Sequence, residues 1–405
     1  MKVVQINCVY GKGSTGKITQ AIHTGLKERG IRSVVLYGRG KKADDVNAHK
    51  TCPDILAKVH NLITHVTGIM YGSCWLSTKY LIWKIKKERP DIVHLQCING
   101  YFVNIYQLIE WLKKNNIPTI LTLHAEFMFT ANCSHAYDCE QWKSACTCCS
   151  DWKRATKSIF FNRTDRSFQK MKSAFAGFRN LTVVSVSPWL RHRAEQSAIL
   201  GDKEQTVILN GVDERVFFLK DKEILREKYG IESERVILHV TADFRTEKNH
   251  AKGGYYVLEL ARRMPECQFI IVGKHEKVKN LPLNVQLAGE VGEPERLGEF
   301  YNIADLCLLT SRRETFSMVC AESLCCGTPV AGFSAGGPES IAFPEYSEFC
   351  EYGDIEQLQK TVRHMLLQPF DRKMISEQAK KCYSNKKMLE YYIKEYEKRL
   401  CRYPD

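Results

Sequence analysis

The stretch SRRETFSMVCAESLCCGTPVAG, residues 311–332, decides how the chain folds. It begins where the apolar run DLCLLTS (305–311) ends, and it finishes in a second apolar run, TPVAGF (328–333). The residues between the two runs have a helical pattern that starts near Phe316 or Ser317. A strand, a helix and a second strand in this order predict a βαβ unit of a parallel sheet.

The same rhythm extends along the chain in two series of short apolar runs. Runs without strict alternation of apolar and polar residues suit strands that helices cover on both faces. A single sheet of this many parallel strands would be unusually wide, so the sequence predicts two doubly wound α/β domains that face each other across a ligand cleft. The predicted strands are KVVQINC (2–8), RSVVLYG (32–38), DIVHLQC (91–97), IPTILTLH (117–124), LTVVSVS (181–187), RVILHVT (235–241), CQFIIVG (267–273), VQLAGEV (285–291), DLCLLTS (305–311) and TPVAGF (328–333).

The restart of the pattern places the domain boundary. Residues 1–205 are predicted to form the first domain and residues 206–380 the second. The last segment, 381–405, contains an amphipathic helical pattern over 384–400 behind Ser384, a residue that suits a helix N-cap. We expect this closing helix to pack back on the first domain.

Composition limits the class of protein. The chain has 405 residues, of which 44% are hydrophobic and 26% charged, so it is neither disordered nor fibrous. Lys and Arg number 59 against 46 Asp and Glu, which predicts an acidic partner: a phosphorylated small molecule, a nucleic acid or an anionic membrane. The 17 cysteines and the lack of an apolar leader favour the reducing cytoplasm. The stretch 54–88 carries too many charges for a membrane-spanning helix.

The first candidate phosphate site is GKGSTGKIT (11–19), a glycine-rich turn that opens a helix. Gly13 and Gly16 would let an anion approach the backbone closely, although an ordinary tight turn explains them equally well. The string also resembles the nucleotide-triphosphate loop, with Lys17 in place, which makes a P-loop phosphotransferase an alternative function. However, Ile18 stands where a hydroxyl should hold Mg²⁺, and this weakens that alternative.

The second candidate is the start of the helix in 311–332. The first amides of a helix have no acceptor inside it and carry the positive end of its dipole, so they suit a diphosphate. Glu314 precedes this helix and Glu322 lies within it, and carboxylates accept hydrogen bonds from sugar hydroxyls. The amides proposed for the diphosphate are those of Phe316, Ser317, Met318 and Val319.

These residues resemble the retaining, nucleotide-sugar-dependent glycosyltransferases of family four, which have the two-domain GT-B fold. Glu314 and Glu322 reproduce that family's Glu-x7-Glu element, and the resemblance extends over essentially the whole chain. The further segments that resemble the family are VILNGVDERVF (207–217), YNIADLCLLTS (301–311), CGTPV (326–330) and GGPESI (336–341).

The resemblance implies a role for each matching residue. Glu314 would bind hydroxyls of the donor sugar, and Glu322 would bind the ribose of the nucleotide. Within ADFRTEKNHAKGG (242–254), Lys252 before Gly253 looks most like the family's cation for the departing diphosphate, with Arg245 a second candidate.

In the first domain, His124 at the end of a strand looks like the family's histidine beside the transferred sugar. Many relatives follow that histidine with Asp, but here Ala125 and then Glu126 follow it. The implied reaction is front-face transfer with retention, from a nucleotide-diphosphate sugar to a glycan or lipid-linked saccharide in bacterial capsule or exopolysaccharide synthesis. The sequence has no Asp-x-Asp pair, so we expect catalysis without a metal cofactor.

The stretch NCSHAYDCEQWKSACTCCS (132–150) holds five of the 17 cysteines. Their spacing predicts either a structural Zn²⁺ site or a packed, redox-labile thiol cluster. The stretch resembles a cysteine-rich insert of bacterial capsule and exopolysaccharide members of the family. The thiols proposed for zinc are Cys133, Cys139, Cys146 and Cys149.

The segment 152–179 combines many Lys and Arg with several aromatic residues. Such a segment could rest on an anionic membrane that holds a lipid-linked acceptor, which would place the protein at the inner face of the membrane. The ordinary alternative puts the aromatic residues in the core and the cations in water. A nucleic-acid-binding protein is a further alternative, but no recognisable nucleic-acid module supports it, so we expect no nucleic-acid partner.

Overall fold

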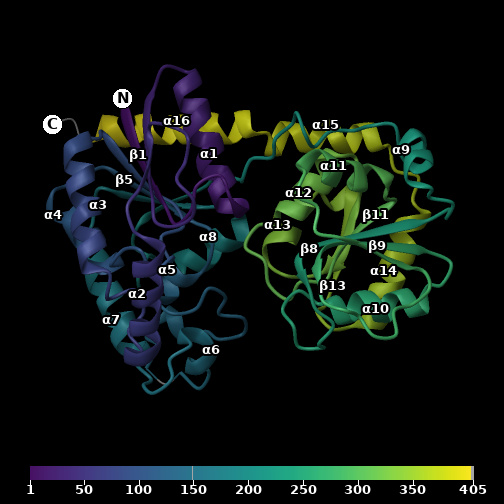
Figure 1. Cartoon of the computed structure of the whole chain (residues 1–405), viewed down its shortest axis with the longest axis horizontal. Coiled ribbons are helices and arrows are strands. Elements are labelled where there is room, and N and C mark those ends of the chain that lie inside the picture. The colour runs from purple at the N-terminus through teal and green to yellow at the C-terminus, as the bar shows by residue number, and fades with distance from the viewer. Residues whose placement is uncertain (148, 403–405) are drawn as a thin grey trace. The chain divides into compact units, whose positions relative to one another are not determined.

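The computed structural model describes residues 1–147 and 149–402, and these divide into two compact units. The first unit contains Met1–Leu209 together with Met388–Asp405, and the second contains Asn210–Lys387. Each unit is built on a parallel sheet with helices on both faces (Figure 1). The predicted fold class, two doubly wound α/β domains, is therefore confirmed.

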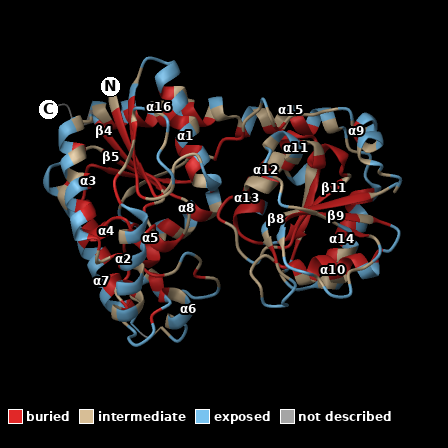
Figure 2. Cartoon of the chain, in the orientation of Figure 1, coloured by how far each residue is buried: buried red, intermediate tan, exposed pale blue. Residues whose placement is uncertain are grey.

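The described residues of the first unit form a seven-stranded sheet in the order β3-β2-β1-β4-β5-β6-β7. Neighbouring strands are parallel, and those at the centre of the sheet are buried (Figure 2). Its strands are β1 (Lys2–Asn7), β2 (Arg32–Tyr37), β3 (Ala48–Lys50), β4 (Ile92–Leu95), β5 (Thr119–Leu123), β6 (Leu181–Ser185) and β7 (Glu204–Val207). Its helices are α1 (Gly13–Glu28), α2 (Asp54–Thr67), α3 (Trp75–Glu88), α4 (Ile105–Lys114), α5 (Phe127–Thr130), α6 (Trp152–Thr156), α7 (Thr164–Phe175) and α8 (Pro188–Glu195).

The described residues of the second unit form a six-stranded parallel sheet in the order β10-β9-β8-β11-β12-β13. Helices α10 and α14 cover one face, while α11, α12 and α15 lie on the other (Figure 1). The strands are β8 (Val236–Phe244), β9 (Gln268–His275), β10 (Val285–Gly289), β11 (Leu306–Leu309), β12 (Val330–Phe333) and β13 (Ser347–Cys350). The helices are α9 (Lys222–Tyr229), α10 (Gly254–Arg263), α11 (Pro294–Ile303), α12 (Met318–Cys325), α13 (Gly337–Ile341), α14 (Ile355–Leu367) and α15 (Arg372–Tyr383).

The closing helix α16 (Asn385–Arg402) begins at the end of the second unit and continues into the first. The hydroxyl of Ser384 accepts a hydrogen bond from the amide of Lys387, which confirms the predicted N-cap. Tyr392 and Tyr396 are buried in the first unit, as the apolar stripe predicts. The sequence pattern did not reveal that Arg399 is also buried, where it pairs with Glu204 of β7 at 2.7 Å.

His94 of β4 joins this helix to the sheet. Its ring is fully buried and forms hydrogen bonds with the hydroxyls of Tyr396 (2.7 Å) and Thr122 (2.8 Å). Burial lowers the pKa of His94 to about 3, with a smaller contribution from nearby His124. The folded protein therefore holds this imidazole neutral.

Acid is expected to destabilise the protein through His94. An unfolded chain takes up a proton at this position below pH 6.5, but the folded chain resists it down to about pH 3, so stability is present above pH 6.5 and is lost as pH falls. Lowering the pH from 7 to 5 should cost about 2 kcal/mol at this position. Thermal unfolding at both pH values, for the native chain and for His94→Gln, measures this loss. An equal pH dependence in the variant would contradict the assignment.

The apolar side chains of the segment 152–179 are divided between the core and the surface. Four of the apolar side chains that suggested a membrane face are buried: Phe168, Met171, Phe175 and Phe178. The exposed apolar side chains of its described residues lie instead in the loop that follows α6, at Ile159, Phe160 and Phe161. Of the two predicted alternatives, the core interpretation holds for α7.

Among the described residues, none of the helices combines the length and the low charge needed to cross a membrane. Helices α2 and α3 divide the stretch 54–88, and each carries charged residues.

Candidate functional site

The candidate site lies where the connections of the second sheet change direction. From β8 the chain moves outward to β9 and β10, whereas β11 lies on the other side of β8 and leads to β12 and β13. The loops after β8 and β11 therefore diverge at the carboxyl edge of the sheet, which is where doubly wound sheets bind ligands. These loops carry Lys252 and Glu314.

Lys252 and Glu314 form an ion pair across this switch point. The Nζ atom of Lys252 lies 2.6 Å from Oε1 of Glu314. The Lys252 side chain is 39% exposed and that of Glu314 24%, so both remain accessible to a ligand. A second side chain also joins the two loops, because the Thr310 hydroxyl donates to the Lys252 carbonyl at 3.0 Å. The structure thus brings together two residues predicted for one site.

Gly253 makes this close approach feasible. Its φ is +67°, and a Cβ atom there would lie 2.1 Å from the Thr310 carbonyl oxygen. A side chain at this position would meet both the strain of the left-handed region and a clash with backbone. The Lys-Gly sequence therefore has a structural basis: the glycine allows the loop to hold Lys252 beside β11.

The segment GGPESI (336–341) holds Glu314 in place. The Glu314 amide donates to the Ala335 carbonyl at 3.0 Å, and the Gly337 amide donates to the Glu314 carbonyl at 2.8 Å. Glu339 in turn accepts hydrogen bonds from the amides of Ala335 and Gly336. These bonds fix the backbone on which the Glu314 carboxylate stands.

Helix α12 begins directly after Glu314. Ser317 is its N-cap, with φ +79° and a hydroxyl that accepts from the Cys320 amide at 3.3 Å. Phe316 is buried and its ring meets Tyr383 edge-on, which anchors the turn. Met318 and Val319 form the first turn and are partly exposed. The helix end that was predicted to receive a diphosphate is thus held beside Glu314.

Glu322 lies inside α12 and is oriented by a buried tyrosine. The Tyr301 hydroxyl of α11 donates to Oε2 of Glu322 at 2.9 Å. Burial, with the Glu322 carboxylate nearby, raises the pKa of Tyr301 well above its ordinary value, so the hydroxyl stays protonated and able to donate. The sequence alone does not indicate this role of Tyr301.

Arg245 has other partners. It forms ion pairs with Asp243 (2.9 Å) and with Glu276, and these two carboxylates raise its pKa. The structure therefore brings Lys252 and Glu314 together but places Arg245 in a separate group of charges.

Several predicted residues belong to the first unit, at the carboxyl edge of its sheet. His124 follows β5 and its Nε2 atom lies 2.8 Å from Oε1 of Gln96. Burial lowers the pKa of His124 to about 4, so the imidazole is neutral at pH 7. Gly13 begins α1 with φ +62°, and a Cβ atom at Gly16 would lie 3.1 Å from a methyl carbon of Val9. The close packing at Gly16 supports the tight-turn interpretation of this loop.

The surroundings of Glu126 indicate that it stabilises the fold. Its side chain is fully buried, pairs with Arg193 of α8 and accepts a hydrogen bond from the Ala136 amide at 2.6 Å. Arg193 also lies over the rings of Trp142 and Trp189. Glu126 therefore ties the end of β5 to the cysteine-rich insert.

The four cysteines predicted for zinc lie near one another. Burial raises the pKa of Cys133 to about 12, and the neighbouring Cys149, Cys146 and Cys139 add to this shift. Among the described residues, however, no group of three or more Cys, His, Asp or Glu side chains is arranged to hold a metal ion. Cys148 lies outside the described residues. The zinc site stays a prediction.

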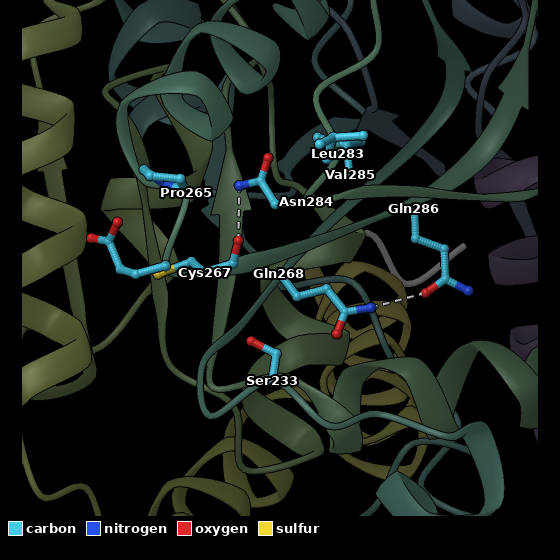
Figure 3. Close-up of a pocket in the computed structure, with 9 residues that line it drawn as sticks. Ser233, Pro265, Cys267, Gln268, Leu283, Asn284, Val285 and Gln286 are labelled. Carbon is cyan, nitrogen blue, oxygen red and sulfur yellow. Dashed lines mark hydrogen bonds between the residues drawn. The ribbon is translucent and has the colours of Figure 1, made fainter.

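A cavity of about 310 Å³ lies elsewhere in the second unit (Figure 3). Its walls include Gln268 and Val285, the first residues of β9 and β10, so it lies at the amino edge of the sheet. This is the edge opposite to Lys252 and Glu314. The cavity therefore has no part in the candidate site.

Comparison with known proteins identifies the family. Residues 16–216 match the family described as Glycosyltransferase Family 4, and residues 221–382 match the one described as Glycosyl transferases group 1. The chain belongs to glycosyltransferase family 4. Lys17 of this glycosyltransferase is exposed and lies four residues inside α1, so it does not stand at the start of the helix as in a nucleotide-triphosphate loop.

Relatives of the glycosyltransferase are known from several bacteria. It is 20% identical to the putative colanic acid biosynthesis glycosyl transferase WcaC of Escherichia coli, over 98% of this chain and 100% of that one. It is 30% identical to N-acetyl-alpha-D-glucosaminyl L-malate synthase of Bacillus anthracis, over 38% of this chain and 42% of that relative.

Solved structures share the fold of the glycosyltransferase. Sucrose-phosphate synthase of Thermosynechococcus elongatus superposes with a TM-score of 0.72 at 14% identity, over 100% of both chains. Anabaena HepE in complex with UDP and glucose superposes with a TM-score of 0.66 at 14% identity, over 98% of this chain and 99% of that one.

Proposed function

We propose that the protein is a retaining glycosyltransferase that moves a sugar from a nucleotide-diphosphate sugar to a glycan or lipid-linked saccharide in bacterial surface-polysaccharide synthesis. The observation that carries the proposal is the Lys252–Glu314 pair at the switch point of the second sheet, beside the start of α12. The solved HepE complexes with UDP and UDP-glucose support the choice of donor, and the relative WcaC supports the choice of pathway. We place the reaction in the cytoplasm, where nucleotide sugars are made.

The donor has two kinds of group that the site can bind. Its diphosphate is attracted by the first amides of α12 and by the ammonium of Lys252. Its sugar hydroxyls donate hydrogen bonds to Glu314, and its ribose hydroxyls donate to Glu322, which Tyr301 orients. Carboxylates repel phosphate. The diphosphate is therefore expected to lie at the start of α12 and Lys252, with the sugar at Glu314 and the ribose at Glu322.

The proposed chemistry follows from that placement. The bond between the anomeric carbon and the diphosphate oxygen breaks, and the acceptor oxygen attacks from the same face, so the anomeric configuration is retained. The proton of the acceptor hydroxyl passes to an oxygen of the departing diphosphate. Lys252 and the start of α12 stabilise the negative charge that develops there. A neutral His124 can hydrogen-bond to the transferred sugar without adding charge.

Transfer is expected to proceed without a metal cofactor. The charge of the leaving diphosphate is met by Lys252 and the α12 amides, so EDTA should change the initial rate by less than about twofold. The measurement is the rate of transfer before and after brief chelation, with Mg²⁺, Mn²⁺ or Zn²⁺ added back separately. A rate that falls and is restored by Mg²⁺ or Mn²⁺ would contradict metal independence, whereas restoration by Zn²⁺ alone would indicate a structural zinc in the cysteine-rich insert.

The proposal is tested by a donor screen. A donor that binds the folded protein alone must raise its unfolding temperature, so a thermal-shift screen of nucleotides and nucleotide sugars identifies the base and the sugar. Incubation of the best donor with saccharide acceptors, followed by NMR of the product, then shows whether the anomeric configuration is kept. Failure of every nucleotide sugar to bind would refute the proposed donor, and an inverted product would refute the proposed mechanism.

A further inference from the structure

Helix α2 differs from an ordinary amphipathic helix, because its large apolar side chains face outward rather than into the core. The residues of α2 that are buried in the first unit are small or polar: Ala57, His60 and Thr64. The outward face carries large apolar side chains that form one stripe along the helix. Their exposed fractions range from 77% at Ile55 to 40% at Val66. Water is a poor environment for such a stripe, so it marks an interaction surface. The stripe comprises Ile55, Val59, Leu62, Ile63 and Val66.

The loop after α6 extends this stripe. The Ile159 amide donates to the carbonyl of His65 in α2 at 2.8 Å. The Phe161 carbonyl oxygen packs against Gly68, the residue that follows α2, where a Cβ atom would lie only 2.5 Å away. Ile159, Phe160 and Phe161 are 56%, 65% and 48% exposed. We call the α2 stripe together with these three residues the apolar ridge.

Helix α3, which follows α2 after seven residues (68–74), shows a second exposed set with a different character. Trp75, Tyr80 and Trp83 are each about half exposed. The ammonium groups of Lys79 and Lys84 lie 5.8 Å from the Trp75 ring and 5.7 Å from the Trp83 ring. Exposed Trp and Tyr beside Lys is the combination found where proteins meet the head-group region of a bilayer.

The excess of positive charge on these elements indicates which partner the apolar ridge and α3 would bind. Helices α2 and α3 and the segment 157–163 contain two acidic residues, Asp54 and Glu88, which pair with Lys50 and Lys2. Against them stand cations whose stems can lie along the apolar surface: Lys58, Lys79, Lys84, Lys86, Lys87, Lys157 and Arg163. A second copy of the chain would bring like charges together, whereas a surface of anionic lipid would complement them.

We propose that the apolar ridge and α3 form a docking surface for a phospholipid bilayer that contains anionic lipid. The apolar side chains enter the boundary between head groups and acyl chains, and the lysines meet lipid phosphates. The proposal concerns where the protein resides and needs no step of the proposed transfer. It also moves the membrane-facing residues from α7, whose aromatic side chains are core, to α2, α3 and the loop at 159–161.

Vesicle sedimentation tests the proposal without any donor or acceptor. The full chain should bind vesicles of phosphatidylcholine with phosphatidylglycerol at least about tenfold more tightly than vesicles of phosphatidylcholine alone, and salt should weaken the binding. Phe160→Ser with Phe161→Ser should weaken it by about tenfold or more. Lys84→Ala with Lys87→Ala should do the same through charge, at about fivefold for each lysine.

Matched controls come from the second unit. Leu283 and Leu367 are also exposed apolar residues, so Leu283→Ser with Leu367→Ser removes similar apolar area and should leave vesicle binding unchanged. Equal loss in this control, or full binding by the Phe160/Phe161 variant, would overturn the proposal. A chain that dimerises in solution and becomes monomeric in the Phe160/Phe161 variant would also overturn it, because the occupant would then be a second copy. Lys84 is partly exposed and the other substituted positions are exposed, so the variants should fold, and unaltered unfolding temperatures verify this.

Discussion

Lys252→Ala is expected to lower kcat/KM for sugar transfer by about 10²–10³-fold. The Lys252 ammonium lies 2.6 Å from Glu314 at the switch point of the second sheet, where the leaving diphosphate is proposed to form. Removing a preorganised cation leaves the developing charge to the α12 amides alone. Because this interaction grows stronger as the bond breaks, the loss should fall mainly on kcat. Initial rates over a range of donor concentrations measure both constants.

Glu314→Gln tests the other half of the pair. An amide can accept one hydrogen bond from a sugar hydroxyl but cannot hold Lys252 by charge, so we expect a loss of similar size. The double variant should lose much less than the product of the two single losses, since the two residues act together. Lys248→Ala is the matched control, because Lys248 is an exposed lysine of the same loop that lies over Tyr255. Its activity should remain near that of the native chain.

The unfolding temperatures of these variants show whether a loss of activity comes from the site or from a folding defect. Both side chains of the pair are partly exposed, and such ion pairs contribute about 0–1 kcal/mol to folding. The unfolding temperature of Lys252→Ala should therefore change little. Full activity in Lys252→Ala and Glu314→Gln at an unchanged unfolding temperature would rule out the proposed site.

The ten strands predicted from apolar runs are all present, whereas three further strands of the described residues were missed. The missed strands are β3, β7 and β13, whose sequences AHK, EQTV and SEFC have no apolar run. Each is an edge strand of its sheet, with a paired strand on one side only, so burial does not impose a run of apolar residues. Apolar periodicity therefore indicates the central strands of a sheet but does not indicate edge strands of this kind.

The sequence likewise predicted only part of the candidate site. The sequence indicated that Glu314, Glu322 and Lys252 bind the donor, because each belongs to a recognisable motif. It could not indicate that Lys252 contacts Glu314, since 62 positions separate them and the contact depends on the order of β8 and β11 in the sheet. The bond from Tyr301 to Glu322 likewise depends on how α11 packs against α12.

Glu126→Ala is expected to reduce the free energy of unfolding by about 3–5 kcal/mol. The Glu126 side chain is fully buried, and that of its partner Arg193 is 11% exposed. Removing the carboxylate leaves the buried guanidinium with the more distant and more exposed Glu140, at 4.0 Å, as its counter-charge and deprives the Ala136 amide of its acceptor. Glu126→Gln should lose less, because its amide oxygen can still accept one of these bonds. Denaturant unfolding followed by tryptophan fluorescence gives both values.

Glu195→Ala is the matched control, since Glu195 pairs with Arg191 of the same helix α8 but both side chains are more than one-third exposed. This exposed pair should contribute less than about 1 kcal/mol. The comparison also decides the role of the acidic residue that follows His124 and Ala125. If Glu126 acts by holding α8 and the cysteine-rich insert against the end of β5, Glu126→Gln will keep kcat/KM within a few-fold at temperatures where it is folded. A hundredfold loss of kcat in a fully folded Glu126→Gln would instead require the carboxylate itself to act in the transfer, because the packing it supports would still be intact.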